Sequence, residues 1–121
     1  MGKSMLNKYN KNLSIITAGK VPPNPAEMLA SKAMTAFLKE MKEHFDYIVL
    51  DTPPVQAVAD AQILSTKVDG TLVVVRAGVT KKDEVQNTVN TLKKVNADII
   101  GTILHAVDNT RNKYQYYYGN E

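Results

Sequence analysis

The chain has 121 residues, enough for one compact domain with a modest core that buries roughly 65% of its unfolded surface. A hydrophobic fraction of 44% and a charged fraction of 22% exclude the disordered and fibrous classes, and a net charge of +3 without a cluster of Lys and Arg argues against nucleic acid as a partner. The longest apolar runs, residues 47–50 and 71–75, are far shorter than the roughly 20 residues that a membrane-spanning helix needs. The absence of cysteine excludes disulfides and thiolate metal sites, and it agrees with a cytoplasmic location.

The amino-terminal third of the chain predicts one short strand and one long helix. Residues 1–12 are polar and are expected to be irregular, whereas residues 13–18 form a short apolar run typical of a strand. Asn24 is a suitable helix N-cap, followed by a proline at the first helical position, and Glu27 can complete a capping box. The helix is expected to continue to about His44, with its apolar residues on one face.

An apolar run that ends on a carboxylate occupies the middle of the chain. Residues 47–50 are apolar on both faces and predict a buried strand, and Thr52 and two prolines follow Asp51. Ligands of open α/β sheets bind beyond the carboxyl ends of the strands, where a lone carboxylate can hold Mg²⁺ against nucleotide phosphates. The alternative is that Asp51 only caps a turn.

Helices and strands alternate in the rest of the chain. Thr80 and Asp83 have the spacing of a second capping box, and the last strand leads to His105. The expected elements are a short helix within residues 56–67, a strand over 71–76, a helix over 80–95 and a strand over 98–104. This alternation predicts an α/β fold, a parallel sheet with helices on both faces, within residues 1–107.

Residues 108–121 form a tyrosine-rich tail. Four of the six tyrosines of the chain lie in it, at Tyr114, Tyr116, Tyr117 and Tyr118, without large apolar neighbours. A buried edge strand would need such neighbours and a partner for each hydroxyl, so an exposed and flexible terminus is expected. The tail could be a binding surface or a substrate.

Several motifs together resemble the carboxyl half of the P-loop kinase domain of bacterial tyrosine kinases, which act in capsular and extracellular polysaccharide synthesis. The resemblance runs from about Asn12 to Gly119. The motifs that carry it are residues 22–29, residues 45–54, Asp60-Ala61, residues 68–70 and the terminal tyrosines.

The resemblance implies a P-loop NTPase-like fold and a role for each candidate residue. Residues 47–54 would be the Walker B element, in which Asp51 is catalytic and helps to hold Mg²⁺. His105 stands where the family often has asparagine near the adenine of ATP, although it could merely end a strand. The tail tyrosines would be the autophosphorylation cluster. The Walker A strand and loop are expected upstream of this chain, which therefore should be inactive alone and bind Mg²⁺ and ATP poorly.

Two classes of function stay open on these grounds. The chain could be the carboxyl-terminal portion of an ATP-dependent protein tyrosine kinase. It could instead be a non-catalytic, truncated phospho-acceptor or interaction module, or a fragment of a partitioning-type P-loop ATPase. Partners implied by the family are a second copy or an intact kinase, a membrane-bound polysaccharide co-polymerase or activator subunit, and a tyrosine phosphatase. The implied location is cytoplasmic, at the inner face of the plasma membrane through a partner.

Overall fold

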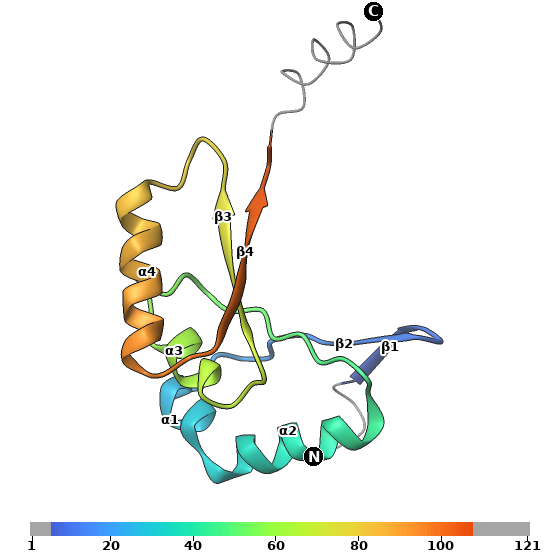
Figure 1. The fold of residues 1–121 in the computed structure, drawn as a ribbon. Helices are drawn as coiled ribbons and strands as arrows, with labels where there is room; N and C mark the ends of the chain where they lie inside the picture. The colour runs from blue at the N-terminus through green and yellow to red at the C-terminus, as the bar shows by residue number, and fades with distance from the viewer. Residues whose placement is uncertain (1–5, 108–121) are drawn as a thin grey trace, which may run out of the picture.

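The computed structural model describes residues 6–107, which form helices and two separate pairs of strands (Figure 1). The elements in chain order are β1 (Leu6–Asn10), β2 (Leu13–Ile16), α1 (Pro25–Ala30), α2 (Lys32–His44), α3 (Asp60–Ser65), β3 (Thr71–Arg76), α4 (Lys82–Lys94) and β4 (Ile99–His105). α1 packs against α2 and α3, and α4 packs against α3 and β4. The predicted domain boundary after residue 107 stays a prediction, because residues 108–121 lie outside the described range.

A β3–α4–β4 unit forms the centre of the fold. β3 and β4 pair in parallel, with a register that runs from Leu72 opposite Gly101 to Arg76 opposite His105. Parallel neighbours require a crossover connection, and α4 supplies it. The α/β class with parallel strands, which the alternating sequence pattern predicts, is thereby confirmed.

The hydrophobic core is small and is made of residues from α2, α3, β3 and α4. Leu92 of α4 is its most enclosed member, with 1% of its surface exposed, and Val73 of β3 is 6% exposed. The buried hydrophobic residues of the described chain are Leu38, Ala61, Leu64, Val73 and Leu92. Leu38 belongs to the apolar stripe predicted for the long helix, so the helical period correctly indicated which face is covered.

Ser31 divides the predicted long helix into α1 and α2. Its backbone is extended, with φ −65° and ψ 157°, so the helical hydrogen-bond ladder stops there. The Ser31 hydroxyl donates to the carbonyl of Met28 at 2.6 Å and accepts from the amide of Met34 at 3.1 Å. One side chain therefore ends α1 and caps α2.

The predicted N-cap at Asn24 is confirmed in position, but its side-chain amide donates to the Glu27 carboxylate at 2.9 Å, and the side chain caps no backbone group.

α4 is capped one residue later than the sequence pattern predicts, and the helix begins at Lys82. Its N-cap is Lys81, whose amide donates to the Glu84 carboxylate at 2.9 Å, whereas Thr80 accepts a hydrogen bond from the amide of Arg76 at 3.0 Å. The helix ends in a Schellman motif, because the amide of Ala97 donates to the carbonyl of Leu92 at 3.1 Å and Asn96 adopts a positive φ of 56°.

The predicted buried strand over residues 47–50 is wrong. This segment has no regular secondary structure, and Tyr47 and Val49 are each 90% exposed. Its apolar composition suits a sheet interior, but a strand also needs a neighbouring backbone to complete its hydrogen bonds. The strand pairings of the described residues join only β1 with β2 and β3 with β4.

The first twelve residues are not wholly irregular, because β1 pairs with β2 in an antiparallel hairpin. The register runs from Leu6 opposite Ile16 to Asn10 opposite Leu13, with an irregularity between Lys8 and Asn10. The side chain of Asn10 accepts a hydrogen bond from the amide of Asn12 at 2.8 Å and so stabilises the turn. β1 was not predicted because the segment is polar and lacks the apolar pattern of a strand.

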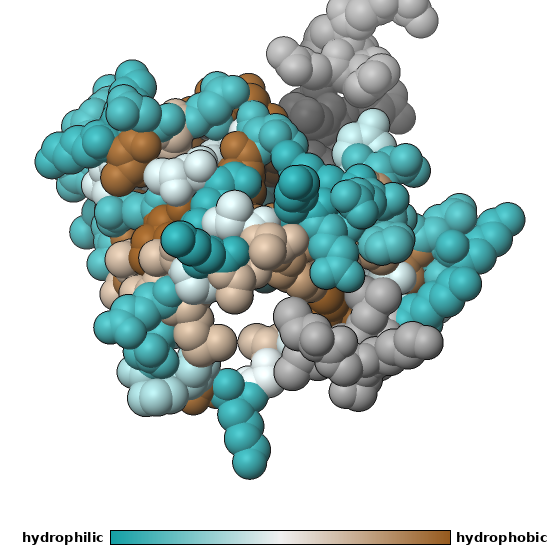
Figure 2. Space-filling model, turned by 90° about the horizontal axis from the view of Figure 1, so that it is seen from below, coloured by the Kyte–Doolittle hydropathy of each residue, from teal (hydrophilic) through white to brown (hydrophobic). Residues whose placement is uncertain are grey.

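Large hydrophobic side chains are exposed on several elements of the molecule. Figure 2 shows some of them, in brown, among hydrophilic residues on the face seen from below. Exposed examples are Leu72 and Val74 on β3 and Ile103 on β4. No helix within residues 6–107 has the length and hydrophobicity needed to cross a membrane.

Candidate functional site

Asp51 lies on the irregular segment that connects α2 to α3, and its side chain is exposed. A turn follows directly, in which the amide of Ala57 donates to the carbonyl of Pro54 at 2.9 Å. Gln56 fixes this turn to α4, because its side-chain amide donates to the carbonyl of Glu84 at 2.9 Å and to the hydroxyl of Thr88 at 3.1 Å. The segment is therefore anchored near Asp51 although it carries no strand.

The carboxyl ends of β3 and β4 place Arg76 and His105 opposite each other. Both side chains are exposed, and the carbonyl of His105 accepts a hydrogen bond from the amide of Ala77 at 2.8 Å. The backbone of His105 thus extends the hydrogen bonding between the parallel strands, and its side chain is exposed at the edge where ligands of α/β sheets commonly bind. The sequence-based reasoning did not consider Arg76, although its position as the last residue of a parallel strand could have identified it.

A guanidinium and an imidazole at this edge suit an anionic ligand. Arginine presents several N–H donors in a planar fork that matches phosphate oxygens. Immediately after β4, Ala106 adopts a positive φ of 56°, a conformation uncommon outside glycine. The backbone therefore bends at Ala106, directly after β4.

A resident metal ion would find few ligands here. Among residues 6–107, no group of three or more His, Asp or Glu side chains is arranged to hold a metal ion. Mg²⁺ is commonly bound through one or two carboxylates together with water and substrate phosphates, so the exposed carboxylate of Asp51 fits the role of one such ligand. The remaining ligands would have to come from the nucleotide, water or groups outside the described residues.

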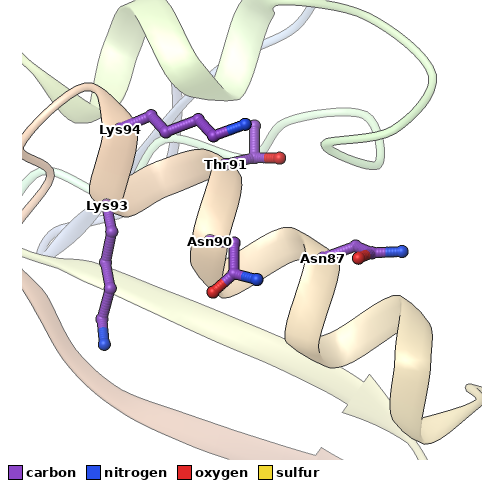
Figure 3. Close-up of a pocket in the computed structure, with 5 residues that line it drawn as sticks. All are labelled: Asn87, Asn90, Thr91, Lys93 and Lys94. Atoms are coloured by element: carbon purple, nitrogen blue, oxygen red, sulfur yellow. The ribbon is translucent and has the colours of Figure 1, made fainter.

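Among the surface hollows of residues 6–107, two are lined by neither Asp51 nor His105. One hollow, of about 530 Å³, is lined by Asn87, Asn90, Thr91, Lys93 and Lys94. Figure 3 shows that these side chains all come from α4 and that Lys93 points away from Lys94. The other, of about 360 Å³, lies between α1, α3 and the residue that follows α4. The first is a helix surface rather than an enclosed site.

The tail tyrosines, Tyr114, Tyr116, Tyr117 and Tyr118, lie outside the described residues. Their assignment as phosphorylation sites therefore stays a prediction. Tyr47 and Tyr9 are described, and they are 90% and 73% exposed. The sequence-based reasoning placed Tyr47 inside a sheet, and its exposure corrects that expectation.

Parallel strands joined by a helix make this an α/β protein, and its likeness to solved tyrosine kinase domains places it in the P-loop NTPase-like class. No protein-family model matches the chain. It is 37% identical over 112 residues to the putative tyrosine-protein kinase CapB of Staphylococcus aureus, covering 92% of this chain and 49% of CapB. It is 36% identical over 119 residues to the tyrosine-protein kinase YwqD of Bacillus subtilis, covering 98% of this chain and 50% of YwqD.

A solved structure supports the same relationship. The kinase domain of the Escherichia coli tyrosine kinase ETK superposes with a TM-score of 0.75 at 37% identity, covering 78% of this chain and 37% of that one. Across the residues that it shares with these proteins, the chain belongs to the bacterial tyrosine kinase family. It spans about half the length of the curated relatives that it matches.

Proposed function

We propose that the chain supplies the carboxyl-terminal portion of an ATP-dependent protein tyrosine kinase that regulates capsular or extracellular polysaccharide synthesis. The observation that carries this proposal is the 37% identity to CapB over 112 residues. Because the chain spans only about half of such relatives, it should need the remaining part of a kinase domain for catalysis.

In the proposed kinase, Asp51 contributes one carboxylate ligand to Mg²⁺. The bound ion would neutralise charge on the phosphates of ATP during transfer. The Gln56 hydrogen bonds to α4 hold the following turn in place, which restricts where the Asp51 carboxylate can lie. In this proposal His105, at the carboxyl end of β4, would contact the nucleotide, and Arg76, its register partner on β3, would provide positive charge at the same edge.

The proposed acceptors of the phosphoryl group are Tyr114, Tyr116, Tyr117 and Tyr118. The partners proposed with this function are a second kinase copy that presents or receives the tail, a membrane-bound co-polymerase or activator subunit, and a tyrosine phosphatase. The proposed location is the cytoplasmic face of the plasma membrane, reached through the membrane-bound subunit.

A reconstitution assay tests this function. The chain would be co-expressed with the part of CapB that it does not match, and transfer of labelled phosphate from Mg-ATP to tyrosine would be measured. Asp51→Asn should abolish transfer, whereas Asp98→Asn, at another exposed carboxylate, should leave it within twofold. A purified complex without transfer, or full activity in Asp51→Asn, would overturn the proposal.

A further inference from the structure

Gln56 joins the segment that carries Asp51 to α4. Its side-chain amide donates to the carbonyl of Glu84 at 2.9 Å and to the hydroxyl of Thr88 at 3.1 Å. These two acceptors lie one helical turn apart, so a single amide group contacts a defined stretch of α4. Within residues 6–107, these are the side-chain hydrogen bonds that connect the irregular segment 45–59 to another element.

The backbone between Asp51 and Gln56 is stiff. Residues 52–54 are Thr-Pro-Pro, and each proline fixes its own φ and keeps the residue before it extended. The turn that follows is closed by a hydrogen bond from the amide of Ala57 to the carbonyl of Pro54 at 2.9 Å. Because a stiff backbone has few soft torsions, a displacement at Gln56 is passed on to Asp51.

The place of the Asp51 carboxylate depends on this backbone. Its side chain is exposed, and the side-chain hydrogen bonds and the ion pair found within residues 6–107 do not involve it. On the amino-terminal side of Asp51, the half-buried Ile48 and Leu50 anchor the backbone by packing. On the carboxyl-terminal side, the anchor is the contact between Gln56 and α4.

We infer that Gln56 is a positioning residue for Asp51. Its hydrogen bonds to Glu84 and Thr88 fix the stiff backbone on α4, and so they place the Asp51 carboxylate where a nucleotide-bound Mg²⁺ can use it. The inference rests on the proposed function, in which Asp51 is a ligand of that ion, and it names a residue that supports the ligand without touching the metal. Loss of groups that orient a metal ligand commonly weakens metal affinity or activity by roughly 10- to 100-fold.

Hydrogen exchange in the full chain tests the contact itself. Gln56→Leu removes both hydrogen bonds at an exposed position and keeps the size of the side chain, so exchange over residues 51–57 should become about fivefold faster. Thr88→Val removes one of the two acceptors and should have a smaller effect. Gln86→Leu is the matched control, because Gln86 is exposed on α4 and its amide donates to Asn90 of the same helix at 3.1 Å. It should leave exchange over residues 51–57 unchanged.

The Mg²⁺ dependence of phosphoryl transfer tests the consequence at Asp51, in the chain co-expressed with the part of CapB that it does not match. In Gln56→Leu, the Mg²⁺ concentration for half-maximal transfer should rise about tenfold, while the rate at saturating Mg²⁺ should change little. A residue that only stabilises the fold would lower the amount of active protein without changing that concentration. The double variant Gln56→Leu/Thr88→Val should behave like Gln56→Leu alone, because Thr88 acts through Gln56.

The inference is overturned if Gln56→Leu leaves exchange over residues 51–57 unchanged, or if Gln86→Leu accelerates it equally. It is also overturned if Gln56→Leu keeps the Mg²⁺ dependence of the wild type, and in that case the proposed function stands. A wild-type complex that transfers no phosphate would instead refute the proposed function, and the positioning role would fall with it.

Discussion

Asp51 is a single exposed carboxylate on an irregular segment, and this sets a limit on what the isolated chain can bind. Mg-ATP is usually held by many contacts to its phosphates, including backbone amides, a lysine and metal ligands. Within the described residues, no three-carboxylate or histidine cluster supports Asp51. Asp51 can therefore supply one ligand of a Mg-ATP site, but the residues around it do not form a complete site.

We accordingly expect the isolated chain to bind Mg-ATP no more tightly than millimolar. One carboxylate cannot offset the cost of immobilising a nucleotide and its metal ion. Titration calorimetry would measure the affinity, with Asp51→Asn as the comparison. Micromolar binding that Asp51→Asn abolishes would contradict this expectation and would show that the described residues hold more of the site than their geometry indicates.

Tyrosine phosphorylation is the second prediction at the scale of single residues. Mixed with an intact kinase of the family and ATP, the chain should receive phosphate within residues 114–118 rather than on Tyr9 or Tyr47. Each phosphate brings about −1.5 to −2 charge, so neighbouring phosphates in the cluster repel one another and should release the tail from the kinase site. Arg111 and Lys113 can offset only the first of these charges.

Mass spectrometry would locate the phosphate. Because Tyr47 is 90% exposed, burial does not protect it, and selectivity for the tail would have to come from recognition of the cluster. A variant with the four tail tyrosines changed to Phe should lose nearly all incorporation and remain bound to the kinase. Preferential labelling of Tyr47 would count against the assignment.

Among the helices, the Ser31 cap is the most specific local determinant. Its hydroxyl serves both α1 and α2, with hydrogen bonds of 2.6 Å and 3.1 Å. Ser31→Ala should lower the free energy of unfolding by about 1 kcal/mol, the usual loss for a helix N-cap. Ser31→Thr keeps the hydroxyl and should lose much less. Urea unfolding followed by circular dichroism would compare the two variants, and equal stability of all three proteins would refute the role of the cap.

The elements of the β3–α4–β4 unit could be predicted from sequence because their signals are local. Residues 71–76 and 98–104 have strand-like apolar runs, and the helix between them repeats its apolar residues at helical spacing. Residues 47–50 carry an equally apolar run but have no paired backbone, and pairing is not a local property. The break at Ser31 was missed because serine is an N-cap only when the preceding residues leave the helix.

In the candidate site too, features that depend on neighbouring residues could be predicted from the sequence, whereas contacts between distant residues could not. His105 at the end of β4 agrees with the expected position after the last strand. The Gln56 hydrogen bonds to α4 could not be predicted. They join Gln56 to residues 28 and 32 positions further along the chain, and the sequence does not show in which direction the turn at Gln56 runs. The proposed role of Asp51 as a Mg²⁺ ligand was suggested by the family resemblance, and within residues 6–107 no group of three or more His, Asp or Glu side chains is arranged to hold a metal ion.

At the scale of the whole molecule, exposed hydrophobic side chains outnumber buried ones among the described residues. The ion pair between Lys42 and Asp69, at 2.9 Å, joins side chains that are 52% and 87% exposed, so it adds little stability. Exposed strand edges and apolar patches of this kind favour association.

We therefore predict that the isolated chain is marginally stable and self-associates with rising concentration. Analytical ultracentrifugation over a hundredfold concentration range should show a shift to larger species. Adding the part of CapB that the chain does not match should suppress that shift, if this part covers the same exposed apolar side chains through which the chain self-associates. A monomer at all concentrations with a sharp, reversible melt above about 60 °C, an upper value for mesophilic domains, would contradict the prediction.

The direct succession of β3, α4 and β4 along the chain also has a kinetic consequence. The β1–β2 pairing joins residues at most 10 positions apart and the β3–β4 pairing joins residues 28 to 29 positions apart, so the hairpin can close faster, but its strands are mostly exposed. Because Val73 and Leu92 are buried, we expect residues 71–105 nevertheless to be the first to acquire lasting hydrogen-exchange protection, before the exposed β1–β2 hairpin does. During synthesis this unit leaves the ribosome after β1, β2, α1 and α2, so these four elements are exposed to solvent before their packing partners in the unit are available. Pulse-labelled exchange during refolding would detect the order, and simultaneous protection of all elements would exclude it.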